Sequence, residues 1–257
     1  MTDAKLIQFL NEKVAAYDQP FFIKDDPISV PHLFSKKQDI EISGFFAAIF
    51  AWGIRTTIIN KSRELMALMD NAPHDFCLHH SDNDLKKLLS FKHRTFNATD
   101  LLYFVAFFKE HYSKHASLET AFSKWMSPTD EDVEKGLNGL YQYFFSLSDV
   151  PGRTLKHIAC PAKNSACKRI NMFLRWMVRP GKNGVDFGIW KNIRPAQLVI
   201  PLDLHVARVA ANFGLLQRTR HDWLAAKELT QTLRLFDAND PCKYDFALFG
   251  LGVLEKF

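Results

Sequence analysis

The sequence predicts an all-α protein of roughly ten or more helices, because apolar residues recur along it at helical spacing. No stretch alternates between apolar and polar residues over a useful length, and only 11 of the 257 residues are glycine. Hydrophobic residues make up 47% of the chain, which is enough to bury a sizeable core. The 23 phenylalanines indicate helices that pack through large aromatic side chains.

The N-terminal part of the chain begins with a helix and a link. Residues 3–17 have the spacing of an amphipathic helix. Pro20, Pro27 and Pro31 predict a link without regular structure up to about residue 37. From Asp39 onward, the strongly apolar sequence predicts two consecutive helices, the first of them nearly buried.

Three signals locate further helices in the middle of the chain. Pro73 begins a short helical piece, and Ser81 or Asp82 is the expected cap of the helix after it. Residues 98–112 form a helix rich in phenylalanine. The stretch 127–132 is a helix-start signature with acidic residues in the first turn, so we expect a helix to follow from it.

The C-terminal part contains the two helices on which the functional argument depends. Lys168 opens an amphipathic pattern whose apolar side includes Phe173 and whose opposite, cationic side includes Arg175. Asp203 begins a second helix after the apolar run 198–202, and Gly214 ends it. Two more helices are expected, over residues 221–236 and 241–254.

Positive charge is concentrated on one segment. Residues 150–185 contain eight lysines and arginines and no acidic residue, whereas the rest of the chain holds 25 basic and 28 acidic residues. This distribution predicts a surface that binds a polyanion such as DNA. A solvated basic surface without a ligand is the alternative.

The cysteines and the hydropathy of the sequence indicate the cellular compartment in which we expect the protein. The four cysteines form no CxxC pair and have no histidine partners at zinc spacing, and no secretory signal precedes the first helix. No apolar run is long enough to span a bilayer. We therefore expect a cytoplasmic, monomeric protein with no membrane partner.

Lys168 and Asp203 are the candidate catalytic residues. Cleavage of an N-glycosidic bond builds positive charge on the sugar, which a carboxylate held near C1′ stabilises. A neutral lysine amine can then attack C1′ and form an imine. Arg169, Arg175 and the positive end of the helix disfavour the charged ammonium of Lys168. As alternatives, Asp203 could be a helix cap alone and Lys168 an ordinary surface lysine.

The turn before the Lys168 helix is the candidate phosphate site. Backbone N–H groups at a helix start bind phosphate, and Lys163, Asn164 and Ser165 lie just before this one. There is no glycine between Gly152 and Gly181, so we expect Asn164 to supply the tight turn in left-handed geometry. The expected DNA-binding residues are Lys163, Asn164, Ser165, Arg169 and Arg175.

The runs CKRINMFLRWMVR and IPLDLHVARVA resemble the helix-hairpin-helix superfamily of DNA glycosylases, whose signature is a lysine helix followed by (I/V)PxDxHVxR. The match covers residues 160–214 and is most similar to the archaeal-type 8-oxoguanine DNA glycosylases. The segment is also similar to that of an uncharacterised bacterial family related to this branch, and we expect the chain to be a member of it. The resemblance implies that Lys168 forms the imine and that Asp203 is the catalytic aspartate.

The resemblance also implies a base pocket and an architecture. Asp245 and Phe249 match the positions of a polar reader of the extruded base and of an aromatic ring stacked on it. As the alternative, Phe249 is a core side chain and Asp245 a buried or capping aspartate. Two helical subdomains are expected, residues 38–182 and residues 1–37 with 183–257, with Lys168 and Asp203 facing each other across a cleft. The implied activity is base-excision repair of duplex DNA with AP lyase activity, acting on an oxidised purine without metal or organic cofactor.

Three other interpretations fit the sequence, one of them a purely structural helical protein whose charge asymmetry is accidental. A DNA-binding protein could keep the fold and the basic surface without catalysis. A metal-dependent hydrolase could use His79, His80, Asp82 or the pair Asp203 and His205, although these residues lack a regular spacing with further ligands.

Overall fold

A computed structural model describes residues 3–257, and the fold is mostly helical with one two-stranded sheet. The all-α prediction is therefore confirmed at the level of fold class. The chain forms two compact units. Unit 1 comprises Met1–Lys24, Ser127–Glu134 and Ala159–Phe257, and unit 2 comprises Asp25–Met126 and Lys135–Ile158. Within residues 3–257, no helix is long and apolar enough to cross a membrane.

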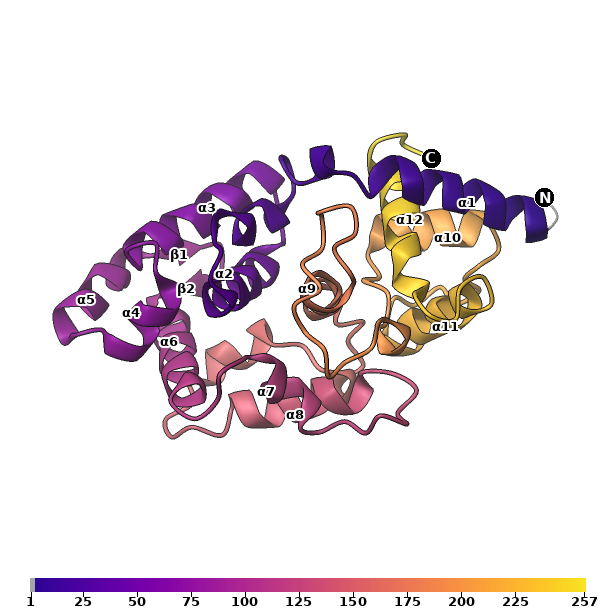
Figure 1. Ribbon diagram of the computed structural model, residues 1–257. Coiled ribbons are helices and arrows are strands. Elements are labelled where there is room, and N and C mark those ends of the chain that lie inside the picture. The colour runs from indigo at the N-terminus through magenta and orange to yellow at the C-terminus, as the bar shows by residue number, and fades with distance from the viewer. Residues whose placement is uncertain (1–2) are drawn as a thin grey trace. The chain divides into compact units, whose positions relative to one another are not determined.

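Unit 1 is built mainly from the two ends of the chain, drawn in indigo and in orange to yellow in Figure 1. Its elements are α1 (Asp3–Tyr17), η1 (Pro20–Phe22), η6 (Pro161–Lys163), α9 (Lys168–Val178), η7 (Pro195–Gln197), α10 (Leu204–Asn212), α11 (Trp223–Arg234), η8 (Pro241–Lys243) and α12 (Tyr244–Val253).

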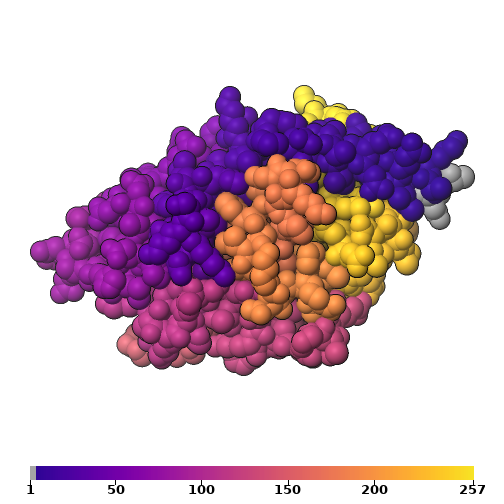
Figure 2. All heavy atoms as spheres, in the orientation of Figure 1, coloured from indigo at the N-terminus to yellow at the C-terminus, as the bar shows by residue number. Residues whose placement is uncertain are grey.

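Helix α12 is the centre of unit 1 because two glycines let its neighbours come close. A side chain at Gly250 would lie 2.4 Å from the ring of Tyr17 in α1, and one at Gly252 would lie 3.1 Å from Cβ of His205 in α10. The indigo and yellow segments accordingly lie side by side on the surface of unit 1 in Figure 2. Arg208 of α10 also donates to the carbonyl oxygens of Gly252 and Phe257, which fixes the end of the chain.

Unit 2 holds the remaining helices and the sheet. Its elements are η2 (Pro27–Ser29), η3 (Pro31–Leu33), α2 (Lys37–Phe50), α3 (Arg55–Leu68), α4 (Pro73–His79), α5 (Asp82–Lys87), η4 (Leu88–Ser90), β1 (Lys92–His93), β2 (Phe96–Asn97), α6 (Ala98–Tyr112), α7 (Glu119–Ser123), α8 (Glu134–Phe144, whose first residue falls in unit 1) and η5 (Gly152–His157).

Phenylalanine rings from α2, α6 and α8 form the core of unit 2. The ring of Phe45 contacts those of Phe104, Phe108 and Phe144, and all four side chains are fully buried. Burying a side chain of this size contributes roughly 2–3 kcal/mol. The predicted aromatic interior and the nearly buried helix after Asp39 are both confirmed, since every α2 residue from Asp39 to Phe50 is buried.

Four details of the predicted fold are wrong. The prolines at 20, 27 and 31 each begin a 3-10 turn, which proline favours at its first position, where no N–H is needed. Strands β1 and β2 pair antiparallel, although no strand was expected. The helix expected after the acidic stretch 127–132 is present as α8, but its start was misplaced: the stretch is a turn, in which Asp130 accepts from the N–H of Ser127, and the helix begins at Glu134. Short α7 was not predicted.

The two units differ from the expected subdomains. Residues 159–182, which we expected in the central subdomain, group with the C-terminal part of the chain in unit 1. Lys168 and Asp203 therefore belong to the same unit, whereas the sequence led us to expect them on different subdomains.

Candidate active site

Lys168 is the first residue of α9 and follows a tightly constrained turn. Cys167 precedes it in left-handed conformation, with φ of 52°. The hydroxyl of Ser165 accepts from the N–H of Cys167 at 3.1 Å, and the side-chain amide of Asn171 donates to the carbonyl oxygen of Ala166 at 3.1 Å. These local bonds determine where α9 begins and therefore where the Lys168 side chain starts.

Asp203 is the N-cap of α10 and is held by the backbone of that helix. Its Oδ1 accepts from the N–H groups of His205 and Val206, both at 2.9 Å. The preceding residues 198–202 are all buried. The N–H of Ile200 donates to the hydroxyl of Thr230 at 3.0 Å, which ties this run to α11. The cap and the buried run together fix the carboxylate in space.

The structure brings Lys168 and Asp203 together. Nζ of Lys168 lies 3.6 Å from Oδ2 of Asp203, and the two side chains are 30% and 19% exposed. Because Oδ1 makes the cap, Oδ2 is the oxygen that faces the lysine. The pair is thus partly buried yet open to a ligand from solvent.

Asp245 is a buried carboxyl beside this pair. The residue is 5% exposed, and its Oδ2 accepts from the guanidinium of Arg175. Burial, the largest cause, and the negative charge of Asp203 raise the pKa of Asp245 to about 6, although the charges of Arg175 and Lys168 oppose them. The charges of Lys168 and Asp203 therefore both act on Asp245.

Phe249 lies one turn after Asp245 on α12 and is half-buried. Its ring meets the ring of Phe22 edge to face, with centroids 6.2 Å apart, and Phe22 also contacts Phe246 at 5.3 Å. A half-buried aromatic ring with a fixed neighbour offers a flat surface to a ligand. Phe22, which lies two residues after Pro20 in a stretch without helical periodicity, was not among the residues predicted from the sequence.

Arg175 does not contribute to the exposed cationic face on which we expected it. It is 4% exposed, contacts Asp245, and its Nε lies 3.4 Å from Oδ1 of Asp186. Arg179, one turn later, is 5% exposed and pairs with Asp18, Asp186 and Asp240. The expected position of Arg175 on an exposed cationic face is therefore wrong, because Arg175 is buried against carboxylates from other parts of the chain.

The other expected DNA-binding residues lie at or near the surface. Lys163 and Asn164 are exposed, and Ser165 and Arg169 are half-buried. Asn164 has φ of 55° and ψ of 26°, so the prediction that it adopts left-handed geometry is confirmed. The Ser165 hydroxyl accepts one internal bond and still has a proton to donate. Burial lowers the pKa of Arg169.

A comparison with known protein families assigns the chain to one of them. The profile of a family described as "Protein of unknown function (DUF2400)" matches residues 26–254. The chain belongs to this family. Comparisons with curated proteins and with solved structures gave no match. The family match spans both units and includes Lys168, Asp203, Asp245 and Phe249, whereas α1 and η1 precede it.

The histidines and aspartates considered for a metal-dependent hydrolase do not form a cluster of metal ligands in the described part of the chain. Among residues 3–257, no three or more His, Cys, Asp or Glu side chains lie together as metal ligands. His79 pairs with Asp75, and the ring of His80 bonds the carbonyl oxygen of Phe76. The four cysteines are free and buried.

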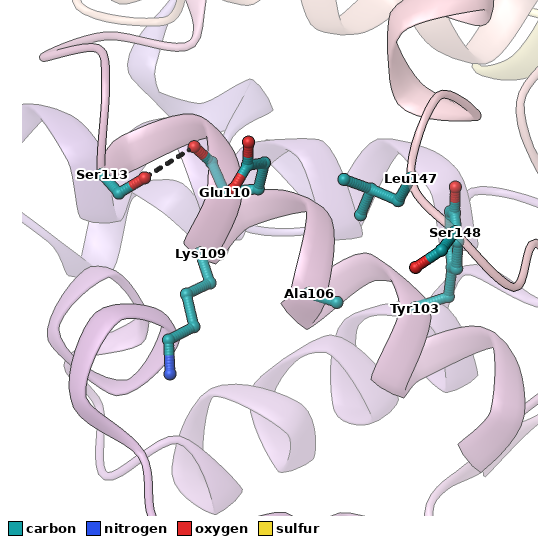
Figure 3. A pocket seen from close by; sticks show the side chains of 7 residues that line it. All are labelled: Tyr103, Ala106, Lys109, Glu110, Ser113, Leu147 and Ser148. Atoms are coloured by element: carbon teal, nitrogen blue, oxygen red, sulfur yellow. Dashed lines mark hydrogen bonds between the residues drawn. The ribbon is translucent and has the colours of Figure 1, made fainter.

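Unit 2 carries a shallow pocket that contains none of the predicted site residues. It has a volume of about 440 Å³ and lies along α6 (Figure 3). Its lining consists of Tyr103, Ala106, Lys109, Glu110, Ser113, Leu147 and Ser148. Ser113 donates to the carbonyl oxygen of Glu110, as the dashed line in Figure 3 marks. The side chains around it form no recognisable catalytic group.

Proposed function

We propose that this protein is a base-excision DNA glycosylase with an associated AP lyase activity. The observation that carries the proposal is the 3.6 Å approach of Lys168 Nζ to Asp203 Oδ2 at the starts of α9 and α10. The cap uses Oδ1 of Asp203, so Oδ2 is left to face the amine of Lys168. In this proposal η6, the Asn164 turn and α9 form the hairpin and lysine helix of a helix-hairpin-helix glycosylase.

Asp203 stabilises the charge that develops as the base leaves. When the C1′–N bond lengthens, positive charge accumulates on the sugar, and a fixed carboxylate near C1′ is favourable to that state. The cap bonds of Asp203 hold its carboxylate in place without reorganisation during the reaction. Mutational loss of one such electrostatic group typically costs about 100- to 1,000-fold in rate.

Lys168 completes the displacement. Its neutral amine forms a bond from Nζ to C1′ while the C1′–N bond breaks, and the base leaves with the bonding electron pair and takes up a proton. Loss of a proton from Nζ and opening of the sugar ring give the imine. Abstraction of a proton from C2′ then expels the 3′ phosphate by β-elimination, and water releases the lysine.

The turn before α9 holds the DNA backbone. The first N–H groups of an α-helix have no partner within the helix, and the helix dipole favours a negative ligand there. Asn164 in left-handed geometry turns the chain next to this helix start. Lys163 adds an exposed cation, and the Ser165 hydroxyl adds a donor. A phosphate at this position is the ligand that these groups favour.

Asp245 and Phe249 supply the base pocket. An extruded base needs a polar group for its edge and a flat partner for its face. Asp245 is buried next to the catalytic pair, and Phe249 lies half-buried one turn away on the same helix. Following the resemblance, we expect an oxidised purine to be the base removed.

A cleavage assay tests the function. Duplex DNA with one 8-oxoguanine is incubated with the protein and then analysed with and without alkali, beside an undamaged duplex. The proposal expects strand cleavage at the lesion alone, already without alkali because of the lyase step, and no cleavage with Lys168→Gln. Salt-dependent DNA binding without cleavage of any lesion in a panel would indicate a binding protein instead.

A further inference from the structure

The guanidinium of Arg175 has a position that DNA binding does not explain. It lies 4.4 Å from the centroid of the Phe246 ring, and it contacts Oδ2 of Asp245 and Oδ1 of Asp186. Stacking on an aromatic face and the hydrogen bond to Asp245 restrict the plane of this guanidinium, and Asp186 is a second carboxylate close to it. Arg175 is therefore a rigid group inside unit 1 rather than a mobile surface cation.

This arrangement leaves one oxygen of Asp245 available. Contacts within residues 3–257 engage Oδ2, and none of them engages Oδ1. The Asp245 side chain keeps 7% of its surface exposed, and Oδ1 is the oxygen that Arg175 does not occupy. A buried carboxylate with one oxygen bonded and the other open is a single, directed hydrogen-bond acceptor.

We propose that Arg175 is a positioning residue for base recognition: it holds Oδ2 of Asp245 so that Oδ1 accepts from an N–H donor on the extruded base. The ligand class is thus a base whose edge presents N–H groups, as purines oxidised at C8 do. This inference rests on the proposed function, because it assigns a partner to the base-reading carboxylate of that site. Arg175 touches Asp245 and not the reacting atoms.

The alternative is that Arg175 is only structural, and Arg179 is the matched control for it. Both arginines lie on or next to α9, both are buried, and both pair with Asp186. Arg179 pairs in addition with Asp18 and Asp240, whereas Asp245 is bonded by Arg175. If Arg175 is only structural, substitutions of Arg175 and Arg179 should have the same effect. If Arg175 positions Asp245, substitution of Arg175 alone should impair recognition of the base.

Two reactions separate base reading from lysine chemistry. Excision of 8-oxoguanine requires the base pocket, whereas borohydride trapping on DNA with an abasic site requires Lys168 but no base. Arg175→Lys keeps the charge and loses the fork that fixes Asp245. We expect excision to fall about 10- to 100-fold with trapping within about threefold of wild type. Arg179→Lys should keep the wild-type ratio of the two reactions.

A double-mutant cycle completes the test. If Arg175 acts through Asp245, then Arg175→Lys should lower excision no further in an Asp245→Asn background. If Arg175→Lys is poorly folded, Arg175→Met takes its place in the Asp245→Asn background, because this double variant removes both charges together. Three outcomes would overturn the inference. Arg175→Lys could lower excision and trapping equally, Arg179→Lys could lower excision while sparing trapping as Arg175→Lys does, or the effects in the cycle could be additive. A wild-type protein that neither excises nor traps would instead refute the proposed function.

Discussion

The carboxylate of Asp203 uses its two oxygens for different partners: Oδ1 caps α10 through His205 and Val206, and Oδ2 lies 3.6 Å from Nζ of Lys168. One side chain therefore begins a helix and faces an amine from another helix. The capping role and the proposed electrostatic role can be separated by experiment, because an amide retains the first and removes the second.

Asp203→Asn should keep most of the stability and lose the activity. The amide oxygen can accept from both N–H groups, whereas Asp203→Ala removes the cap at a cost of about 1 kcal/mol. Excision should fall by about 100-fold or more in both variants, since neither has the negative charge. Urea unfolding and single-turnover excision measure the two effects. Wild-type excision by Asp203→Asn would reduce Asp203 to a helix cap.

Asp245 should make the stability of the protein depend on pH. Its pKa in the folded protein is about 6, against a usual value of 3.8, so the folded state binds the proton more tightly than the unfolded state does. The resulting stabilisation is complete below about pH 4 and is lost as the pH rises through about 6, for a total on the order of 3 kcal/mol.

The Asp245→Asn variant isolates this contribution. Urea unfolding of both proteins between about pH 4 and pH 7 gives the difference in their free energies of unfolding. We expect wild type to lose stability relative to Asp245→Asn as the pH rises through this range. A difference that is constant with pH would mean that the carboxyl of Asp245 titrates normally.

The left-handed turn at Asn164 should accept glycine and reject a β-branched residue. Asn164 has φ of 55°, a conformation that costs a β-branched residue roughly 1–2 kcal/mol more than it costs asparagine or glycine. We expect Asn164→Gly to fold like wild type, and Asn164→Val to be less stable and to bind duplex DNA more weakly. Asn183→Val, at a nearby exposed residue without positive φ, is the control. Equal stability of the two valine variants would show that the turn does not require left-handed geometry.

Lys163 should account for one phosphate contact. Each phosphate neutralised contributes about −0.9 to the slope of the logarithm of the binding constant against the logarithm of the salt concentration. Lys163→Ala should therefore reduce the slope by about this amount on any duplex sequence. Lys5→Ala, at an exposed lysine of α1, should leave it unchanged. Fluorescence anisotropy at several salt concentrations measures both slopes, and identical slopes for wild type and Lys163→Ala would remove Lys163 from the interface.

The parts of the site that the sequence predicts are those with local signals. An aspartate after a buried run marks the start of α10, and the apolar spacing after Lys168 marks α9, so both helix starts could be placed. Asn164 could be assigned left-handed geometry because asparagine tolerates it and no glycine is near.

The parts that the sequence does not predict depend on distant partners. Arg175 lies on the polar side of a helical projection, and its burial follows from Asp245, 70 residues away on α12. Arg179 looked unopposed because two of its carboxylate partners, Asp18 and Asp240, lie far from it in sequence, and the third, Asp186, lies just past the basic segment 150–185. The sheet was missed because β1 and β2 are two residues long, and the turn between them has Arg94 at φ of 55° in place of a glycine.

Borohydride trapping on DNA with an abasic site or 8-oxoguanine tests whether Lys168 forms an imine with the sugar beside Asp203. We expect a covalent protein–DNA adduct with wild type that disappears in Lys168→Gln. Tryptic mapping should locate the adduct on the peptide that contains Lys168. Imine formation at Lys168 would be refuted by an adduct that persists in Lys168→Gln, or by a wild-type protein that binds both substrates and forms no adduct on either.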